Sequence, residues 1–197
     1  MAKDVVVYYA LQSPWTYLGW QRFLDLAADK GVSAVFRPIK MAPVFQASGG
    51  LPLAKRPKQR QAYRMMELKR WREVLGVPLT LEPAFFPVDE SLAALMVIAC
   101  GNLGGDTGAL SLAMLRAVWA EERNLADRPT LLAIAAEQGL DGKALMASAE
   151  TQPIADIYEA HTQAALADGI FGVPTFKLGD ELFWGQDRLD LLARALG

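Results

Sequence analysis

The sequence predicts an α/β fold in which a long helical segment interrupts a small sheet. Two short apolar runs, at residues 5–10 and 32–38, flank one predicted helix near the amino terminus. Strand character returns only near the carboxyl terminus, at residues 175–178 and 181–184. Between these regions, from about residue 41 to 169, the pattern is helical and poor in β-branched runs. These three observations place helices between the two halves of one sheet.

The first strand and helix are indicated by local signals. Residues 5–10 hardly alternate between apolar and polar, which is typical of a strand buried on both faces. Ser13 suits the N-cap position of the next helix, and Pro14 suits its first turn. That helix is predicted to run to about Lys30 and to end at Gly31. The strand over 32–38 then completes a right-handed βαβ unit with parallel strands.

The remaining elements follow in order. Helices are predicted over residues 61–75, 89–100, 107–122, 130–138, 142–149 and 153–168. Gly179-Asp180 marks a hairpin turn between the last two strands, and a final helix covers about 186–196. This order predicts a thioredoxin-like fold with an all-helical domain inserted after the second strand. The thioredoxin-like domain would comprise residues 1–40 and 170–197, and the helical insertion domain 41–169, including the crossover helix that returns to the sheet.

Composition narrows the classes of function. The chain has 197 residues, 52% of them hydrophobic, and a formal charge of −2, which indicates a packed protein without nucleic acid as a partner. No apolar run reaches the roughly 18 residues of a membrane span, and no signal peptide is visible, so a cytoplasmic location without a membrane partner is expected. The single cysteine, Cys100, cannot form an internal disulfide. His161 is the only histidine in the sequence, so no metal site is expected.

Two motifs at opposite ends of the chain are informative together. Ser13-Pro14-Trp15-Thr16 has the form of C-x-x-C with both cysteines replaced, and Gly172-Val173-Pro174-Thr175-Phe176 directly precedes the hairpin. A thioredoxin-like fold brings its active-site turn and its cis-proline loop face to face. Alone, each motif is weak, because Ser13 could be only a helix cap and most X–Pro bonds are trans.

Taken together, these motifs resemble the 2-hydroxychromene-2-carboxylate isomerases. That family belongs to the group that also holds the kappa-class glutathione transferases and the DsbA-like oxidoreductases. The matching blocks occur in the family's order along nearly the whole chain: residues 13–18, Arg37-Pro38, 65–71, 172–176 and 183–190.

The resemblance implies reduced glutathione as cofactor and Ser13 as the catalytic residue. At a helix N-terminus the Ser13 hydroxyl would stabilise a thiolate supplied by the cofactor. Val173, before a cis Pro174, would pair through its backbone with the cysteine moiety of glutathione. Gln186 and Asp187 would bind the γ-glutamyl end, although Asp187 could instead be an acid that merely suits the helix dipole.

A basic segment is expected to attract carboxylates. Residues 55–72 hold eight basic side chains and one acid, and a solvated helix face is the alternative interpretation. The family usually carries a basic residue shortly before Tyr63, which here indicates Arg60 or Lys58 as a further cofactor contact. An asparagine common in the family corresponds to Gly50, so one polar contact is missing.

The activity implied by the resemblance is a glutathione-dependent cis–trans isomerisation of an aromatic pyruvate derivative, of the 2-hydroxychromene-2-carboxylate to trans-o-hydroxybenzylidenepyruvate type. The partner would be a small aromatic carboxylate substrate, and a homodimer is expected. Two alternatives stay open: a kappa-like glutathione transferase and a non-enzymatic DsbA-like binding module. A thiol–disulfide oxidoreductase does not fit a chain with one cysteine.

Overall fold

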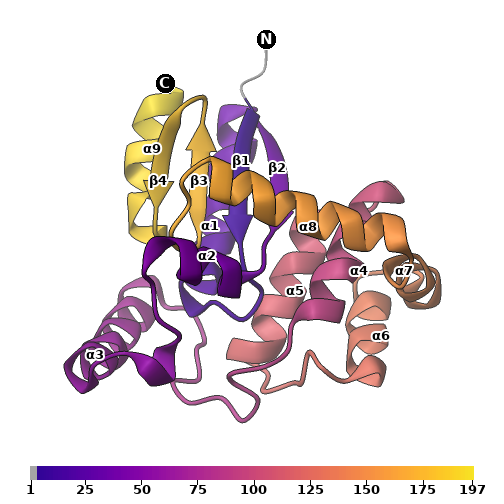
Figure 1. Ribbon diagram of the computed structural model, residues 1–197, viewed down its shortest axis with the longest axis horizontal. Coiled ribbons are helices and arrows are strands. Elements are labelled where there is room, and N and C mark those ends of the chain that lie inside the picture. Colours follow the sequence, from indigo (N-terminus) through magenta and orange to yellow (C-terminus); the bar gives the residue numbers. More distant parts are fainter. Residues whose placement is uncertain (1–3) are drawn as a thin grey trace.

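The computed structural model describes residues 4–197, so the first three residues of the predicted 1–40 part lie outside it. A sheet of four strands in the described chain has the order β2-β1-β3-β4. β1 (Asp4–Tyr9) and β2 (Ser33–Pro38) are parallel, whereas β3 (Thr175–Leu178) and β4 (Glu181–Trp184) form an antiparallel hairpin beside β1. The predicted thioredoxin-like α/β fold is confirmed, and chain segments about 170 residues apart share one sheet (Figure 1).

Helices cover both faces of this sheet. Val5, Val7 and Tyr9 of β1 point into the large core beneath α1 (Pro14–Lys30) and α9 (Leu189–Leu196). The alternate residues Val6 and Tyr8 join a second cluster with α2 (Met41–Ser48) and α8 (Gln152–Ala167). Figure 1 shows α8 crossing the near face of the sheet. The weak alternation of residues 5–10 therefore reflects a strand buried on both sides.

The other helices pack beside and below the sheet. They are the short 3₁₀ turn η1 (Leu53–Lys55), α3 (Lys58–Leu75), α4 (Ser91–Asn102), α5 (Thr107–Trp119), α6 (Arg128–Glu137) and α7 (Gly142–Ala149). The Trp20 indole of α1 donates a 2.9 Å hydrogen bond to the Gly108 carbonyl of α5 and stacks on Tyr9. One hydrophobic cluster thus runs from the sheet into the helical region, and the division at residues 41 and 169 stays a prediction.

Some details differ from the sequence-based expectations. The predicted 107–122 helix ends at Trp119, and Glu122 takes a positive φ of 52°. The predicted last helix opens with a separate 3₁₀ turn, η2 (Gln186–Arg188), before α9 begins. On α3, Tyr63 and Met66 are exposed. Leu68 of that helix is buried, and Met65, Trp71 and Leu75 are partly buried against the same core.

Within residues 4–197, no helix has the length and apolar content needed to cross a membrane. The same residues contain no cluster of three or more His, Cys, Asp or Glu side chains suited to hold a metal ion.

Candidate active site

Ser13 forms a donor-rich turn at the start of α1. Its Oγ accepts a 3.2 Å hydrogen bond from the Thr16 N–H, and its carbonyl accepts one of 3.0 Å from the Tyr17 N–H. The hydroxyl hydrogen of Ser13 therefore remains available for donation. The Trp15 N–H has no partner among the described residues, and Pro14 has no N–H to satisfy. The predicted cap is confirmed, and two hydrogen-bond donors remain at the positive end of the helix dipole.

The second motif lies at the same edge of the sheet as Ser13. The Val173–Pro174 peptide is cis, and the Pro174 carbonyl accepts a 2.8 Å hydrogen bond from the Gly185 N–H. Because β1 and β3 are antiparallel, with Tyr8 opposite Thr175, the end of β1 meets the start of β3. The Val173 N–H and C=O make no hydrogen bond within residues 4–197. This half-buried backbone is an open edge that an extended peptide can join.

The η2 turn is attached firmly to α1. Gln186 is buried, and both its side-chain oxygen and its carbonyl accept hydrogen bonds from Arg22 Nη1, at 2.8 and 3.3 Å. Gly19 of α1 makes this approach possible, because a Cβ there would lie 2.6 Å from the Gln186 Cβ. Asp187 is exposed and pairs with Arg188 at 2.8 Å.

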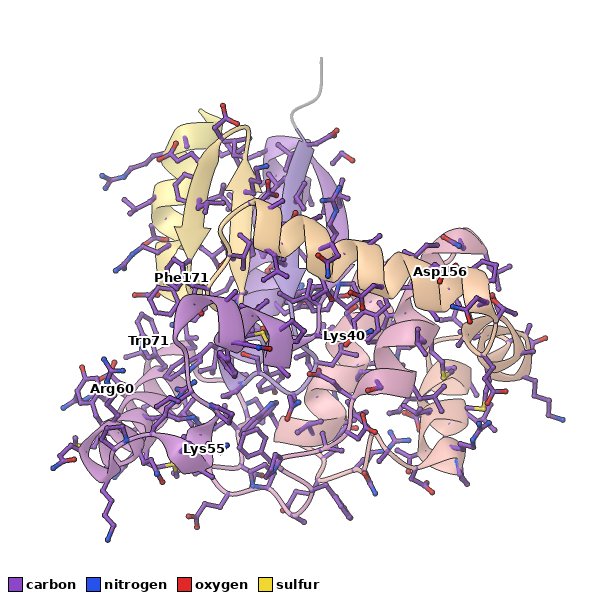
Figure 2. The ribbon with its side chains drawn as sticks, viewed as in Figure 1. Lys40, Lys55, Arg60, Trp71, Asp156 and Phe171 are labelled. Carbon is purple, nitrogen blue, oxygen red and sulfur yellow. The ribbon has the colours of Figure 1, made fainter. Side chains whose placement is uncertain are left out.

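The predicted basic contacts lie apart from this edge. Lys58 and Arg60 are exposed on α3, and Figure 2 shows Arg60 on the outer side of the molecule. No contact joins either of them to the Ser13 turn in the described structure. Gly50 has a packing reason, since a Cβ there would lie 2.6 Å from the Phe45 ring. The family's asparagine would therefore require that ring to move.

Sequence reasoning missed a buried acid beside the Ser13 turn. Glu90 accepts a 2.8 Å hydrogen bond from the Gln12 N–H and one of 3.0 Å from the Gln12 side-chain amide. Burial raises the pKa of Glu90 to about 7, against these stabilising bonds. The sequence suggested Asp89-Glu90-Ser91 as a helix cap, but only Asp89 accepts from the Ser91 N–H. No local pattern could reveal a pairing across 78 residues of chain.

Two cavities each have a volume of about 340 Å³, and the first borders this turn through Gln12. The first lies between α2 and α4, and Lys40, Gln12, Glu90 and Tyr158 line it. The second lies between α3 and the loop that follows it, with Arg64 and Phe86 in its wall. Both are at the lower end of the volume range of small-molecule sites.

Two further titratable residues, Cys100 and His161, have shifted pKa values. Cys100 is fully buried in α4, and burial raises the pKa of its thiol. Burial lowers the pKa of His161 to about 4, and Arg37 adds to this by charge repulsion. A buried thiol with a raised pKa is poorly suited to nucleophilic chemistry, and an imidazole with a pKa of about 4 is a weak base.

Comparison with known proteins decides the family. The family model for the DSBA-like thioredoxin domain matches residues 4–197. The chain belongs to this family. It is 33% identical over 195 residues to a 2-hydroxychromene-2-carboxylate isomerase of Pseudomonas putida, covering 96% of this chain and 92% of that protein. It is 22% identical to glutathione S-transferase kappa 1 of Rattus norvegicus, covering 97% of this chain and 89% of that one.

A solved structure gives the same result as the sequences. The structure of a 2-hydroxychromene-2-carboxylate isomerase matches this DSBA-like domain with a TM-score of 0.86 at 30% identity, over 98% of this chain and 94% of the other. The resemblance inferred from the two motifs is thereby confirmed. This member of the DSBA-like family has Ser13 and Thr16 at the two positions where the C-x-x-C form has cysteine.

Proposed function

We propose that this protein is a glutathione-dependent isomerase that converts 2-hydroxychromene-2-carboxylate, or a related aromatic pyruvate derivative, to a product of the trans-o-hydroxybenzylidenepyruvate type, after the cyclic hemiketal has opened to the cis enone. One observation carries the proposal. The Ser13 turn, with its free hydroxyl hydrogen, lies at the same sheet edge as the cis Val173–Pro174 peptide and the unpaired Val173 backbone. The names of the two isomerase matches and of the kappa-class relative support an isomerase with glutathione as cofactor.

The residues at this edge fit a bound tripeptide thiol. When bound, glutathione would supply a thiolate that adds reversibly to the substrate double bond and so permits rotation about it. Ser13 Oγ–H and the Trp15 N–H would donate hydrogen bonds to the sulfur, and the α1 dipole would stabilise its charge. The Val173 N–H and C=O would hold the cysteine backbone in register. The backbone of Gln186 and the carboxylate of Asp187 would receive the γ-glutamyl group.

Carboxylate groups would be bound by the basic side of the site. The exposed side chain of Lys58 or Arg60 on α3 would extend toward the glycyl carboxylate of glutathione, and its positive charge would attract that carboxylate. A cytoplasmic location and a homodimer belong to the same proposal, because the resemblance implies them. Sedimentation analysis would then give twice the mass of the chain.

The test is turnover of 2-hydroxychromene-2-carboxylate with and without glutathione. We expect isomerisation that requires glutathione and falls about 10- to 100-fold in Ser13→Ala, because one charge-assisted donor to the thiolate is lost. Ser48→Ala is the matched control, since the exposed Ser48 hydroxyl bonds only the Val44 carbonyl. Mass spectrometry of the products separates the alternatives. A stable glutathione adduct would indicate a kappa-like transferase, and absence of turnover would favour a binding module.

A further inference from the structure

Arg64 is a half-buried cation that has no ion-pair partner among the described residues. Its guanidinium lies 5.3 Å from the Phe86 ring centroid and 5.9 Å from that of Trp119. No carboxylate of residues 4–197 comes within ion-pair distance of it, and its polar contact within these residues is a long one of 3.7 Å to the Met65 sulfur. The nearby Arg56 adds positive charge. Such a guanidinium has lost part of its hydration without gaining a counter-charge.

The cavity beside Arg64 has the composition of a site for an aromatic acid. Its volume is about 340 Å³, and the wall is mainly apolar, made by Leu53, Met65, Leu81, Pro83, Phe86 and Pro87. Arg64 and Gln61 are the polar donors in this wall, and Glu82 is an exposed acid in it. The buried Trp119 N–H beneath Arg64 also has no acceptor within the described residues. Apolar walls with a few polar groups are typical of small-molecule sites.

The loop that forms this cavity is attached to the Ser13 turn at both ends. The Tyr17 hydroxyl donates a 2.7 Å hydrogen bond to the Pro78 carbonyl, before the cavity residues of the loop. After them, Glu90 accepts from Gln12, the residue before Ser13. Residues 78–90 therefore run alongside the start of α1, on the side of α3. A substrate held by Arg64 would lie beside the edge assigned to glutathione.

We propose that Arg64, with Phe86, is the binding site for the carboxylate and aromatic ring of the substrate. The identity of the acid rests on the proposed function, whereas the location of its binding site rests on the cavity. Guanidinium pairs with carboxylate through two parallel hydrogen bonds, which lysine does not reproduce. Arg64 differs from the exposed Lys58 and Arg60, which remain assigned to glutathione, by its half-buried position against Phe86 and Trp119.

The experiment is calorimetric titration of the protein with trans-cinnamate, an aromatic carboxylate, and with the uncharged trans-cinnamamide, both without glutathione. Arg64→Met keeps the length and apolar stem of the side chain, and we expect it to weaken cinnamate binding by at least about tenfold. Cinnamamide and glutathione affinities should change by less than about twofold. Arg64→Lys keeps the charge, and its affinity for cinnamate should lie between those of wild type and Arg64→Met. If Arg64→Met loses the cooperative thermal unfolding transition, Arg64→Lys takes its place in the titrations.

Lys69→Met is the matched control, because Lys69 is an exposed cation of the same helix with no role in the proposed site, and it should leave cinnamate binding unchanged. The proposal is overturned if wild type does not bind cinnamate, or if Arg64→Met and Lys69→Met weaken it equally. It is also overturned if Arg64→Met weakens glutathione binding alone, which would assign the cation to the glycyl carboxylate. Cinnamate binding that depends on Arg64 in a protein that does not bind glutathione would support the site and contradict the proposed function.

Discussion

At the scale of single residues, the proposed chemistry depends on the hydrogen bonds that the Ser13 hydroxyl makes and can still make. Ser13 uses its oxygen to cap α1 and keeps its hydrogen, so the same side chain contributes to stability and to the site. Glu90 lies on the other side of the turn and fixes Gln12 through two hydrogen bonds. The turn is therefore held by residues that take no part in the proposed chemistry.

Glu90 gives a prediction for stability against pH. Burial raises its pKa from the ordinary 4.5 to about 7, so the folded protein binds a proton more tightly than the unfolded chain. The contribution to stability is fully present below pH 4.5 and is lost as the pH rises to about 7. We expect Glu90→Gln to remove about 3 kcal/mol of this pH dependence, measured by urea unfolding between these two pH values.

Glu73→Gln is the matched control for that experiment, because it makes the same Glu→Gln change at an exposed position of α3. Its unfolding free energy should keep the wild-type fall between pH 4.5 and 7. If Glu90→Gln kept the wild-type pH dependence as well, the buried carboxyl would not be the group that titrates.

At the scale of elements, α1 and η2 form one unit. Gly19 allows the Gln186 Cβ to approach the helix, and Arg22 then accounts for two of the acceptors on Gln186. The γ-glutamyl position of the proposed site is thus built on α1, the helix that also presents Ser13.

Gly19→Ala tests this unit. The added methyl group would lie 2.6 Å from the Gln186 Cβ, so the η2 turn must move away from α1. We expect glutathione affinity to fall about tenfold and stability to fall by about 1–3 kcal/mol, the usual cost of overpacking. Gln21→Ala on the exposed side of the same helix should change neither. Unchanged affinity in Gly19→Ala, by calorimetry, would contradict the assignment of the γ-glutamyl group to η2.

The elements also show where sequence reasoning succeeds. Caps, glycine stops and the Gly179-Asp180 hairpin predicted most boundaries to within a few residues, because these signals act locally. Ser13 and Pro174 could be paired because the order of elements fixes where the ends of β1 and β3 meet. Glu90, Arg22 and Arg64 could not be found this way. Their roles depend on contacts across long stretches of chain, which leave no periodic signal.

At the scale of the whole molecule, the proposed glutathione site joins the two ends of the chain. Ser13 follows the first strand, while Val173, Gln186 and Asp187 belong to the last fifth of the sequence. A ligand that touches all of them would bind the folded state only, and so would raise the free energy of unfolding by about 2.7 kcal/mol at 100 times its Kd.

Hydrogen exchange gives the expected footprint of that ligand. Glutathione should slow amide exchange in residues 12–17 and 172–188 together, because one ligand would cover both segments. Exchange in α6 and α7, which pack on α4 and α5 at the far end of the molecule, should not change beyond the global stabilisation (Figure 1). Protection confined to one of the two segments would contradict a site shared by both ends.

The most direct test of the central claim is the pKa of glutathione bound to the protein, followed by the ultraviolet absorbance of its thiolate. With Ser13 donating to the sulfur at the start of α1, we expect the wild type to lower the thiol pKa well below its value in water. Ser13→Ala should raise it again by about 1 to 2 pH units, the equivalent of one charge-assisted hydrogen bond. Equal thiol pKa values in wild type and Ser13→Ala would contradict the role of Ser13 as activator of the thiolate.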